Sequence, residues 1–258
     1  MATPYENEDL ALDRAEHRAQ QRERARERML AEVPRFYVPW LHLAGTTGIG
    51  LAMLIAGIVK VHGARPIDFL IVPLTILVST AFEWRVHKKV LHKRMPPFGE
   101  LYDRHTPDHH AVYHEEDMAI RSTREFRLVL IPAVGVLGIV LSTVPIAFAI
   151  GLLFGANAGW IFVVTSSLFM VMYELLHLSY HLPADSFIGR QPLVHWLRRH
   201  HARHHDPRLM QRWNFNVTFP IFDYVMGTVA PPGDAKDVAR LEQHPLGIHA
   251  KTPAPKTH

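Results

Sequence analysis

Long apolar blocks alternate with strongly polar segments along this chain of 258 residues. A helix needs roughly 20 mainly apolar residues to cross a bilayer, and four blocks meet that length. Buried core helices of a soluble protein are the alternative, but the glycines and prolines inside the blocks are more typical of membrane helices. The predicted spans are residues 39–61, 67–87, 128–154 and 159–181. The predicted fold class is therefore all-α, an integral membrane bundle of four transmembrane helices.

The apolar blocks divide the chain into three regions. Residues 1–36 form a charged N-terminal segment, 37–228 a membrane domain, and 229–258 a tail containing proline and lysine. Because more than thirty mostly polar residues precede the first block, that block is not a cleavable signal peptide. Residues 8–33 predict a charged helix with a thin apolar stripe, either solvated or lying on an anionic lipid surface.

The distribution of lysine and arginine predicts the orientation in the membrane. Of the 28 such residues, 7 lie in residues 1–36, 9 in 85–127 and 10 in 190–258, whereas the 60–66 loop holds 2 and the 151–159 loop none. Positive charge accumulates on the cytoplasmic side, so the polar segments between and after the spans are predicted to form a cytoplasmic, histidine-lined helical cap. The expected location is a bacterial inner membrane or the endoplasmic reticulum. This topology also explains the net charge of +4 without a nucleic-acid partner.

Histidine is the residue type that suggests chemistry. The chain has 19 histidines, and 13 of them lie between His87 and His205. It contains no cysteine, which excludes disulfides, zinc ribbons and iron–sulfur clusters.

The first histidine cluster is His87 and His92, at the predicted cytoplasmic end of the second span. On an α-helix five residues turn about 500°, which leaves the two rings roughly 140° apart. They are therefore expected to straddle a site or to serve two metals. Glu83 precedes His87 by four residues, and we expect its carboxylate to orient that imidazole.

The second cluster is His105, His109 and His110 in the sequence HTPDHH. Thr106 followed by Pro107 predicts a helix N-cap and a first helical residue. His105 is then expected to lie outside the helix that carries His109 and His110, so this cluster is expected to be loop-like.

Two more clusters follow. Glu174, His177 and His181 fall within about 60° of one helix face, which favours a metal site over a hydrogen-bonded core histidine. In HHARHH, His201, His204 and His205 span about 100° of a helical wheel, whereas the set with His200 in place of His201 spans about 140°. The tighter arc favours His201, while His195 is expected to be a substrate-side or packing residue.

The number of ligands predicts two metal ions. One zinc ion takes about four ligands, and at least eight well-spaced histidines are present. Imidazole binds iron, zinc, copper and nickel, while the shortage of thiolate and clustered carboxylate argues against copper(I), calcium and magnesium. The residues alone thus predict two transition ions at a membrane face.

The ordered series H-x4-H, H-x3-HH, H-x3-H and H-x2-HH between apolar spans resembles the fatty acid hydroxylase/sterol desaturase superfamily of membrane di-iron oxygenases. The segment NFNVTFPIFDYVMGT, residues 214–228, resembles the closing element of that family, except that Asn216 stands where members often have glycine. The resemblance covers roughly residues 67–228. The histidines that match its motif positions are His87, His92, His105, His109, His110, His177, His181, His201, His204 and His205.

The resemblance implies an enzyme that uses O2 and two iron ions, replaceable by zinc in purified protein, to hydroxylate or desaturate an unactivated C–H position of a lipid. Electrons are expected from a separate donor such as a ferredoxin or a cytochrome with its reductase, and the lipid is expected to enter an apolar tunnel between the spans. Residues expected to support the ligands are Glu83, Glu174, Asn214 and His114. The alternative function is metal binding or metal transport without oxygen chemistry.

Overall fold

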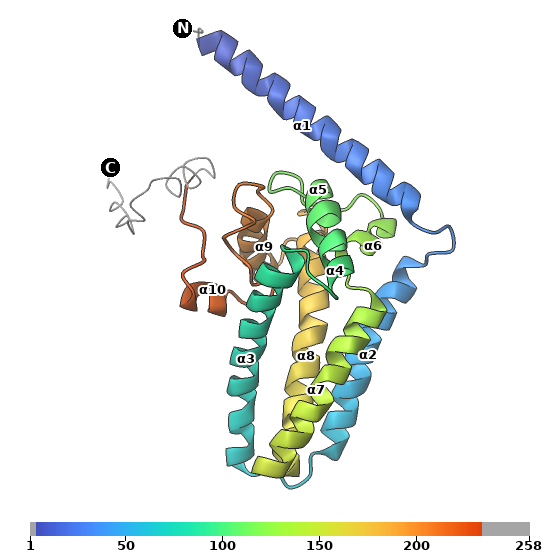
Figure 1. The fold of residues 1–258 in the computed structure, drawn as a ribbon, viewed down its shortest axis with the longest axis vertical. Coiled ribbons are helices and arrows are strands. Elements are labelled where there is room, and N and C mark those ends of the chain that lie inside the picture. Colours follow the sequence, from blue (N-terminus) through green and yellow to red (C-terminus); the bar gives the residue numbers. More distant parts are fainter. Residues whose placement is uncertain (1–3, 234–258) are drawn as a thin grey trace.

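Four long helices form the membrane bundle of the computed structural model, which describes residues 4–233 (Figure 1). The helices long and apolar enough to cross a membrane are Pro39–Lys60, Pro66–Leu91, Ala133–Phe154 and Ala156–Tyr180. Residues 4–233 contain no β-strand, only an isolated bridge between His114 and Asp117. The predicted all-α membrane bundle of four spans is confirmed; the part of the predicted tail from residue 234 onward lies outside the described residues.

The spans are built from α2 (Pro39–Lys60), α3 (Ile71–Val86) with a short 3₁₀ turn before it, α7 (Ala133–Phe154) and α8 (Ala156–Tyr180). The third span was predicted to begin at residue 128, but its helix begins at Ala133. Residues 126–129 form a separate short helix, α6 (Phe126–Val129), and Leu130 is extended (ψ 146°) ahead of Pro132. The residue before a proline is disfavoured in a helix, and Ile131 occupies that position, so the helix restarts only after Pro132.

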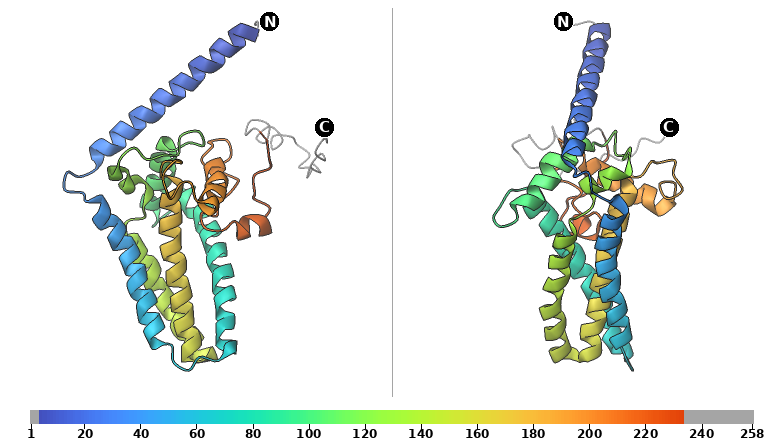
Figure 2. Two further views of the ribbon diagram at one scale, coloured as in Figure 1. Left: turned by 180° about the vertical axis from the view of Figure 1, so that it is seen from behind. Right: turned by 90° about the vertical axis from the view of Figure 1, so that its right-hand side faces the viewer.

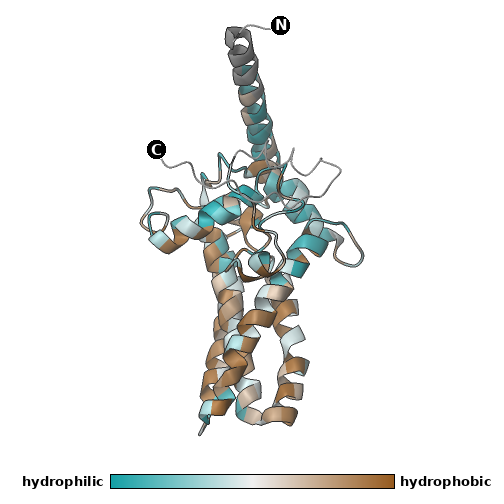
Figure 3. Cartoon of the chain, turned by 90° about the vertical axis from the view of Figure 1, so that its left-hand side faces the viewer, coloured by the Kyte–Doolittle hydropathy of each residue, from teal (hydrophilic) through white to brown (hydrophobic). Residues whose placement is uncertain are grey.

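Helix α8 is the central helix of the bundle, because it packs against α2, α3 and α7. Glycine permits this close packing: a Cβ on Gly50 of α2 would lie 2.6 Å from Val171 of α8, and one on Gly159 of α8 would lie 2.6 Å from the Ala147 carbonyl of α7. Small residues let membrane helices approach in this way. The outer helices expose large apolar side chains such as Ile55, Val78 and Phe148, and Figure 3 shows the bundle as the hydrophobic end of the molecule.

The polar segments collect at one end of the bundle as a cap (Figures 1 and 2). The remaining cap elements are α4 (Gly99–Asp103), α5 (His110–Val112), α9 (Pro192–His204), α10 (Ile221–Val225), two π-helical turns (His87–Leu91 and Arg104–His109) and a 3₁₀ turn (Thr123–Glu125). The links between spans at the other end are short, around residues 61–65 and at Gly155, whose φ of +100° suits glycine. The cap therefore carries almost all of the polar chain between the spans.

Helix α1 (Pro4–Glu32) extends away from the cap but is anchored to it at its C-terminal end (Figure 1). Met29 is buried in the cap core with Val112, Tyr113 and Phe126, and Arg26 is also buried. The predicted charged helix is present. Its C-terminal part packs on protein and is therefore not wholly solvated.

Candidate metal centre

All ten histidines of the four sequence clusters are buried in the cap, none more than 9% exposed. Nine of them form two groups in which the possible ligand atoms all lie within 4.8 Å of one another. The first group, called site A here, is His87, His92, His105, His110 and His204; the second, site B, is His109, His177, His181 and His201. The sequence clusters are thus divided between the two sites, since residues next to each other in sequence serve different groups.

His205 lies between the two sites. Its Nε2 is 3.0 Å from Nε2 of His201 in site B, and its ring stacks on that of His110 in site A with centroids 4.3 Å apart. The tenth histidine is therefore placed to serve either group.

Two π-helical turns bring histidines five residues apart to the same site. His87 and His92 flank the turn His87–Leu91, and their rings stack with centroids 5.0 Å apart. The prediction that their rings diverge by roughly 140° is wrong, because a π-turn bonds residue i to i+5 and lays these residues over each other. The same geometry joins His105 to His110, where the N–H of His110 donates to the carbonyl of His105. Such turns are frequent at functional sites.

The predicted N-cap at Thr106 is also wrong. Thr106 and Pro107 lie inside the π-turn Arg104–His109, which continues α4 into α5, so His105 is on the helix and not in a loop. The Thr106 hydroxyl donates instead to the carbonyl of Leu91, 2.6 Å away. This bond ties the two π-turns together and leaves the threonine oxygen as an acceptor.

Backbone carbonyls orient five of the ten histidine rings. The Nδ1 atom of His109 donates to Leu128 O at 2.9 Å, that of His181 to Met118 O at 2.8 Å, that of His204 to Trp213 O at 2.8 Å and that of His205 to Tyr113 O at 2.7 Å, and that of His87 bonds to Phe215 O. A histidine that donates Nδ1–H keeps the lone pair on Nε2, the tautomer that binds metal.

The pair His92 and His204 shows that these residues suit a cation. Nδ1 of His92 lies 3.3 Å from the Thr106 oxygen, whose own proton is used by Leu91, so His92 donates there. His204 donates its Nδ1–H to Trp213. Both Nε2 atoms therefore carry lone pairs, and they face each other at 2.9 Å. No proton is available between them, whereas a metal ion coordinated by both nitrogens removes the repulsion.

Site B gives independent support. The Nε2 atoms of His109, His177 and His181 are buried and have no hydrogen-bond partner. A buried nitrogen without a partner is costly, and three at one place are explained by coordination to a shared ion. No carboxylate belongs to either group, so both sites offer only neutral imidazole, a ligand of iron, zinc, copper and nickel.

The electrostatics of the cap favour neutral histidine. Burial lowers the pKa of His92 to about 2, with nearby His87 and His205 adding to the shift. Burial first, and the neighbouring imidazoles second, also hold the pKa well below its ordinary value in seven others: His105, His109, His110, His181, His201, His204 and His205. These rings are ready to bind a metal without first losing a proton.

Helix α9 directs three histidines inward and turns His200 away. His201, His204 and His205 are fully buried, whereas Nε2 of His200 bonds to Asp223 at 3.0 Å. His195 is exposed, so it is not the packing residue that was one of its two predicted roles.

No hydrogen bond joins Glu83 to His87, contrary to the prediction. Its carboxylate accepts hydrogen bonds from the backbone N–H groups of Val217 and Thr218, from the Thr218 hydroxyl at 2.6 Å and from the Asn216 amide at 3.2 Å. Glu83 therefore fixes the 216–218 segment, and the adjacent Phe215 carbonyl holds His87. Asn216 adopts no left-handed backbone; among the non-glycine residues of 4–233, positive φ occurs at Asn214, at 57°.

The other three residues predicted to support the ligands also bond to groups other than the rings of sites A and B. Glu174 accepts from the N–H of Ile131 at 3.4 Å, and its second oxygen is buried without a hydrogen-bond partner. Asn214 bonds to the backbone of His200 and Ala230. His114 lies at the cap surface near Glu116, 4.0 Å away. None of the hydrogen bonds found for these side chains reaches a ring of site A or site B.

Several supporting groups were missed by the sequence analysis. Asp223 is fully buried and accepts from the N–H groups of Phe215 and Asn216 and from the Thr228 hydroxyl, which organises the segment behind site A. Its only signal was its place in the closing element. Tyr113 and Glu125 carried no signal, and Thr106 suggested only a helix N-cap, because the roles of all three depend on contacts distant in sequence.

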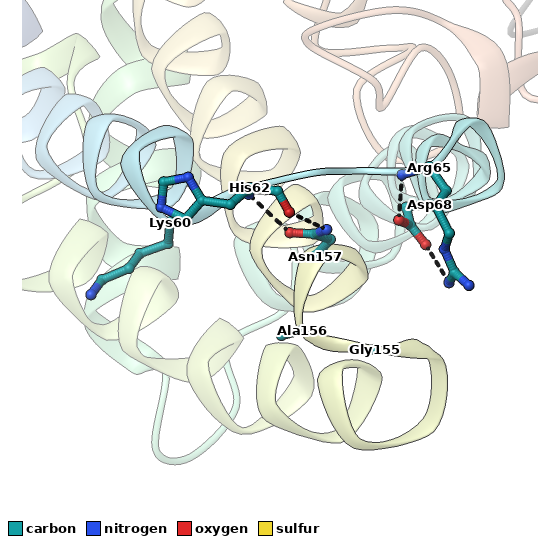
Figure 4. Close-up of a pocket in the computed structure, with 7 residues that line it drawn as sticks. All are labelled: Lys60, His62, Arg65, Asp68, Gly155, Ala156 and Asn157. Carbon is teal, nitrogen blue, oxygen red and sulfur yellow. Dashed lines mark hydrogen bonds and ion pairs between the residues drawn. The ribbon is translucent and has the colours of Figure 1, made fainter.

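One cavity, with a volume of about 400 Å³, lies at the opposite end of the spans (Figure 4). It is lined by Lys60, His62, Arg65, Asp68, Gly155, Ala156 and Asn157. Another, of about 110 Å³, is bordered by Met29, Arg104 and Leu128. Neither runs between the spans, and the apolar tunnel stays a prediction.

Fold and site together define an integral membrane protein with a buried, histidine-lined candidate centre for two metal ions at one end of the bundle. The chain belongs to the fatty acid hydroxylase family, whose sequence profile matches residues 72–228. The family implies an oxidoreductase. No curated protein and no solved structure matches the chain significantly.

Proposed function

We propose that the protein is a membrane-bound, non-haem di-iron oxygenase that hydroxylates or desaturates an unactivated C–H position of a lipid. The observation that carries the proposal is the pair of Nε2 atoms of His92 and His204, 2.9 Å apart with no proton to share. Family membership supports the oxidoreductase class, and the division of nine histidines into two groups supports two ions. Zinc has the same ligand preference and is expected to replace iron in part of the purified protein.

Both proposed reactions balance with O2, two electrons and two protons. Hydroxylation consumes the lipid C–H bond, one O2, two electrons and two protons, and yields an alcohol and water; desaturation with the same inputs yields an alkene and two waters. Two iron ions held by sites A and B would supply the activation of O2 that cleavage of an unactivated C–H bond needs. The chain's own contribution is to fix the rings through their Nδ1 bonds to carbonyls such as Leu128 O and Trp213 O, and to exclude water by burying them.

The cap is proposed to face the cytoplasm, on a bacterial inner membrane or the endoplasmic reticulum. The proposal rests on the positive-inside rule, since the cap end carries most of the lysine and arginine. A separate ferredoxin or cytochrome with its reductase is proposed to deliver the electrons there. The lipid is proposed to reach the site from the bilayer, along the apolar spans.

Metal transport is the rival function, and the distribution of ligands argues against it. Transport needs polar groups along the whole path through the bilayer. Sites A and B both lie at the cap end, and within residues 4–233 no third group of three or more ligand-type side chains occurs along the spans. A permeating ion would have no succession of sites to follow.

The test is the lipid composition of membranes with and without the protein, supplied with ¹⁸O2. We expect a lipid that gains one ¹⁸O atom or loses two hydrogen atoms only when the intact protein is present, as measured by mass spectrometry. His204→Ala at equal expression is the control, because it removes one of the two facing nitrogens. Identical lipids from the intact protein and His204→Ala would contradict the proposal.

A further inference from the structure

A buried ion pair joins the N-terminal helix to the cap. Arg26 of α1 is 3% exposed and bonds to Glu125, whose side chain is 1% exposed. The pair is enclosed by the cap core that contains Met29 and Phe126. Arg26 also lies 3.8 Å from Asp117, which is 28% exposed. Two further ion pairs of α1 with the cap, Arg22 with Glu116 and Arg121 with Glu23, each include an exposed partner, and exposed pairs contribute little.

Glu125 bonds to Tyr113 as well as to Arg26. The same carboxylate that holds Arg26 accepts the Tyr113 hydroxyl at 2.9 Å and the backbone N–H groups of Arg121 and Ser122 at 2.9 and 3.1 Å. The Arg26 guanidinium also lies over the Tyr113 ring, 5.4 Å from its centroid.

Tyr113 in turn contacts the candidate metal centre. Its ring centroid is 4.5 Å from that of His181 and 5.1 Å from that of His109, both members of site B. Its carbonyl accepts the Nδ1–H of His205 at 2.7 Å, and Nε2 of His205 is 3.0 Å from His201 of site B. An unbroken series of contacts therefore runs from Arg26 to site B.

We infer that Arg26 is a positioning residue of site B, acting through Glu125 and Tyr113, so that α1 completes the metal centre although it lies outside the family match at residues 72–228. The inference rests on the proposed function only in taking site B to hold a metal ion. Without Arg26, Glu125 is left as a buried charge without its cation. Tyr113 then loses a fixed acceptor, and the His205 ring loses a fixed carbonyl.

The test compares metal retention in Arg26→Met, which preserves the apolar stem, with Arg24→Met on the same helix. Arg24 is exposed, so it controls for the loss of a charge from α1. Each detergent-purified, iron-loaded protein is treated with a chelator, and the remaining ions per chain are counted by mass spectrometry. Loss of a residue that supports a ligand weakens metal binding by about 10–100-fold. We expect Arg26→Met to lose one of about two ions first, while Arg24→Met behaves as the parent protein.

Two further variants separate positioning from simple unfolding. Arg26→Lys keeps a cation and is expected to recover part of the metal retention. Tyr113→Phe keeps the ring and the carbonyl but removes the hydroxyl bond to Glu125, so the double variant with Arg26→Met is expected to be little worse than either single variant. Helix content by circular dichroism is expected to match the parent in each.

The result that would overturn the inference is equal metal retention in Arg26→Met and Arg24→Met. Loss of both ions together with lost helix content in Arg26→Met and Arg26→Lys also overturns it, because Arg26 then supports the whole fold and not site B. If the parent protein itself binds well under one ion per chain, the proposed function fails before this comparison begins. The two failures are therefore distinguishable.

Discussion

Removing the Glu83 carboxylate is predicted to destabilise the segment that supports site A. Four donors end on this side chain: the N–H groups of Val217 and Thr218, the Thr218 hydroxyl and the Asn216 amide. Glu83→Ala leaves all four without their acceptor, and Asn216 and Thr218 are each only 1% exposed. At about 1 kcal/mol or more for each unsatisfied donor, the free energy of unfolding falls by about 4 kcal/mol.

A loss of that size lowers the melting temperature of a chain this long by roughly 10 °C. Because the chain has no cysteine and 5 tryptophans, intrinsic tryptophan fluorescence in detergent is the suitable assay. Trp84 is a useful reporter, since its Nε1 donates to Thr228 at 2.9 Å behind the same segment. Glu83→Gln, which keeps one acceptor oxygen, is expected to melt between the parent and Glu83→Ala.

Glu100→Ala, at an exposed position, is the matched control and is expected to melt as the parent does. In Glu83→Ala, site A is also expected to lose its metal. Once the 216–218 segment is no longer held, the adjacent Phe215 carbonyl has no fixed position from which to orient His87. A Glu83→Ala protein with the parent's melting temperature and metal content would refute the reasoning that the carboxylate holds this segment.

Three further outcomes are expected. Glu174→Ala is predicted to lose metal or activity by about 10–100-fold, since Glu174 holds Ile131 near the Leu128 carbonyl that orients His109; full activity would make it a packing residue only. In α9, His200→Ala and His195→Ala are predicted to keep a measurable fraction of metal and turnover; a dead His200→Ala beside a working His201→Ala would contradict this. The variants predicted to be inactive and to lose metal from the site that they line are His201→Ala, His204→Ala and His205→Ala. Lowering the pH below 6.5 is predicted to lower the melting temperature and release metal: burial lowers the pKa of His92 to about 2, so between these values the unfolded chain binds more protons and stability falls with pH. An unchanged melting temperature from pH 6.5 downward would contradict it.

The membrane bundle was predictable because its signals are local. The length of an apolar run decides whether a helix spans a bilayer, and all four spans were placed within a few residues except the start of the third. That error arose at Pro132, where apolar character continues through residues 128–132 but the helix does not. Hydrophobicity alone does not report such a break.

The sequence predicted which histidines line the metal centre and that two ions bind, but not how the histidines divide between site A and site B. The wheel for α9 worked because that segment is an α-helix with His201 and His204 on its buried face. The wheel for His87 and His92 failed because their turn is π-helical, and nothing in HKKVLH distinguishes the two hydrogen-bond patterns.

The groups that orient the rings were beyond sequence reasoning for a different reason. Most are backbone carbonyls, which every residue has, and they act across long separations, as Tyr113 does for His205 and Met118 for His181. The carboxylates that lie near the ligands in the sequence are those of Glu83 and Glu174. In the structure, Glu83 bonds to the backbone of Val217 and Thr218. These residues follow Phe215, whose carbonyl orients the ligand His87.

The most direct test of the central claim is the number of iron ions per chain, measured by elemental mass spectrometry on protein purified from iron-supplemented cells. We expect about two ions in the parent protein. We expect about one ion in His92→Ala, which removes a site A ligand, and about one in His181→Ala, which removes a site B ligand. Well under one ion per chain in the parent, or full loss of both ions from each single variant, would contradict two separate histidine-lined metal sites.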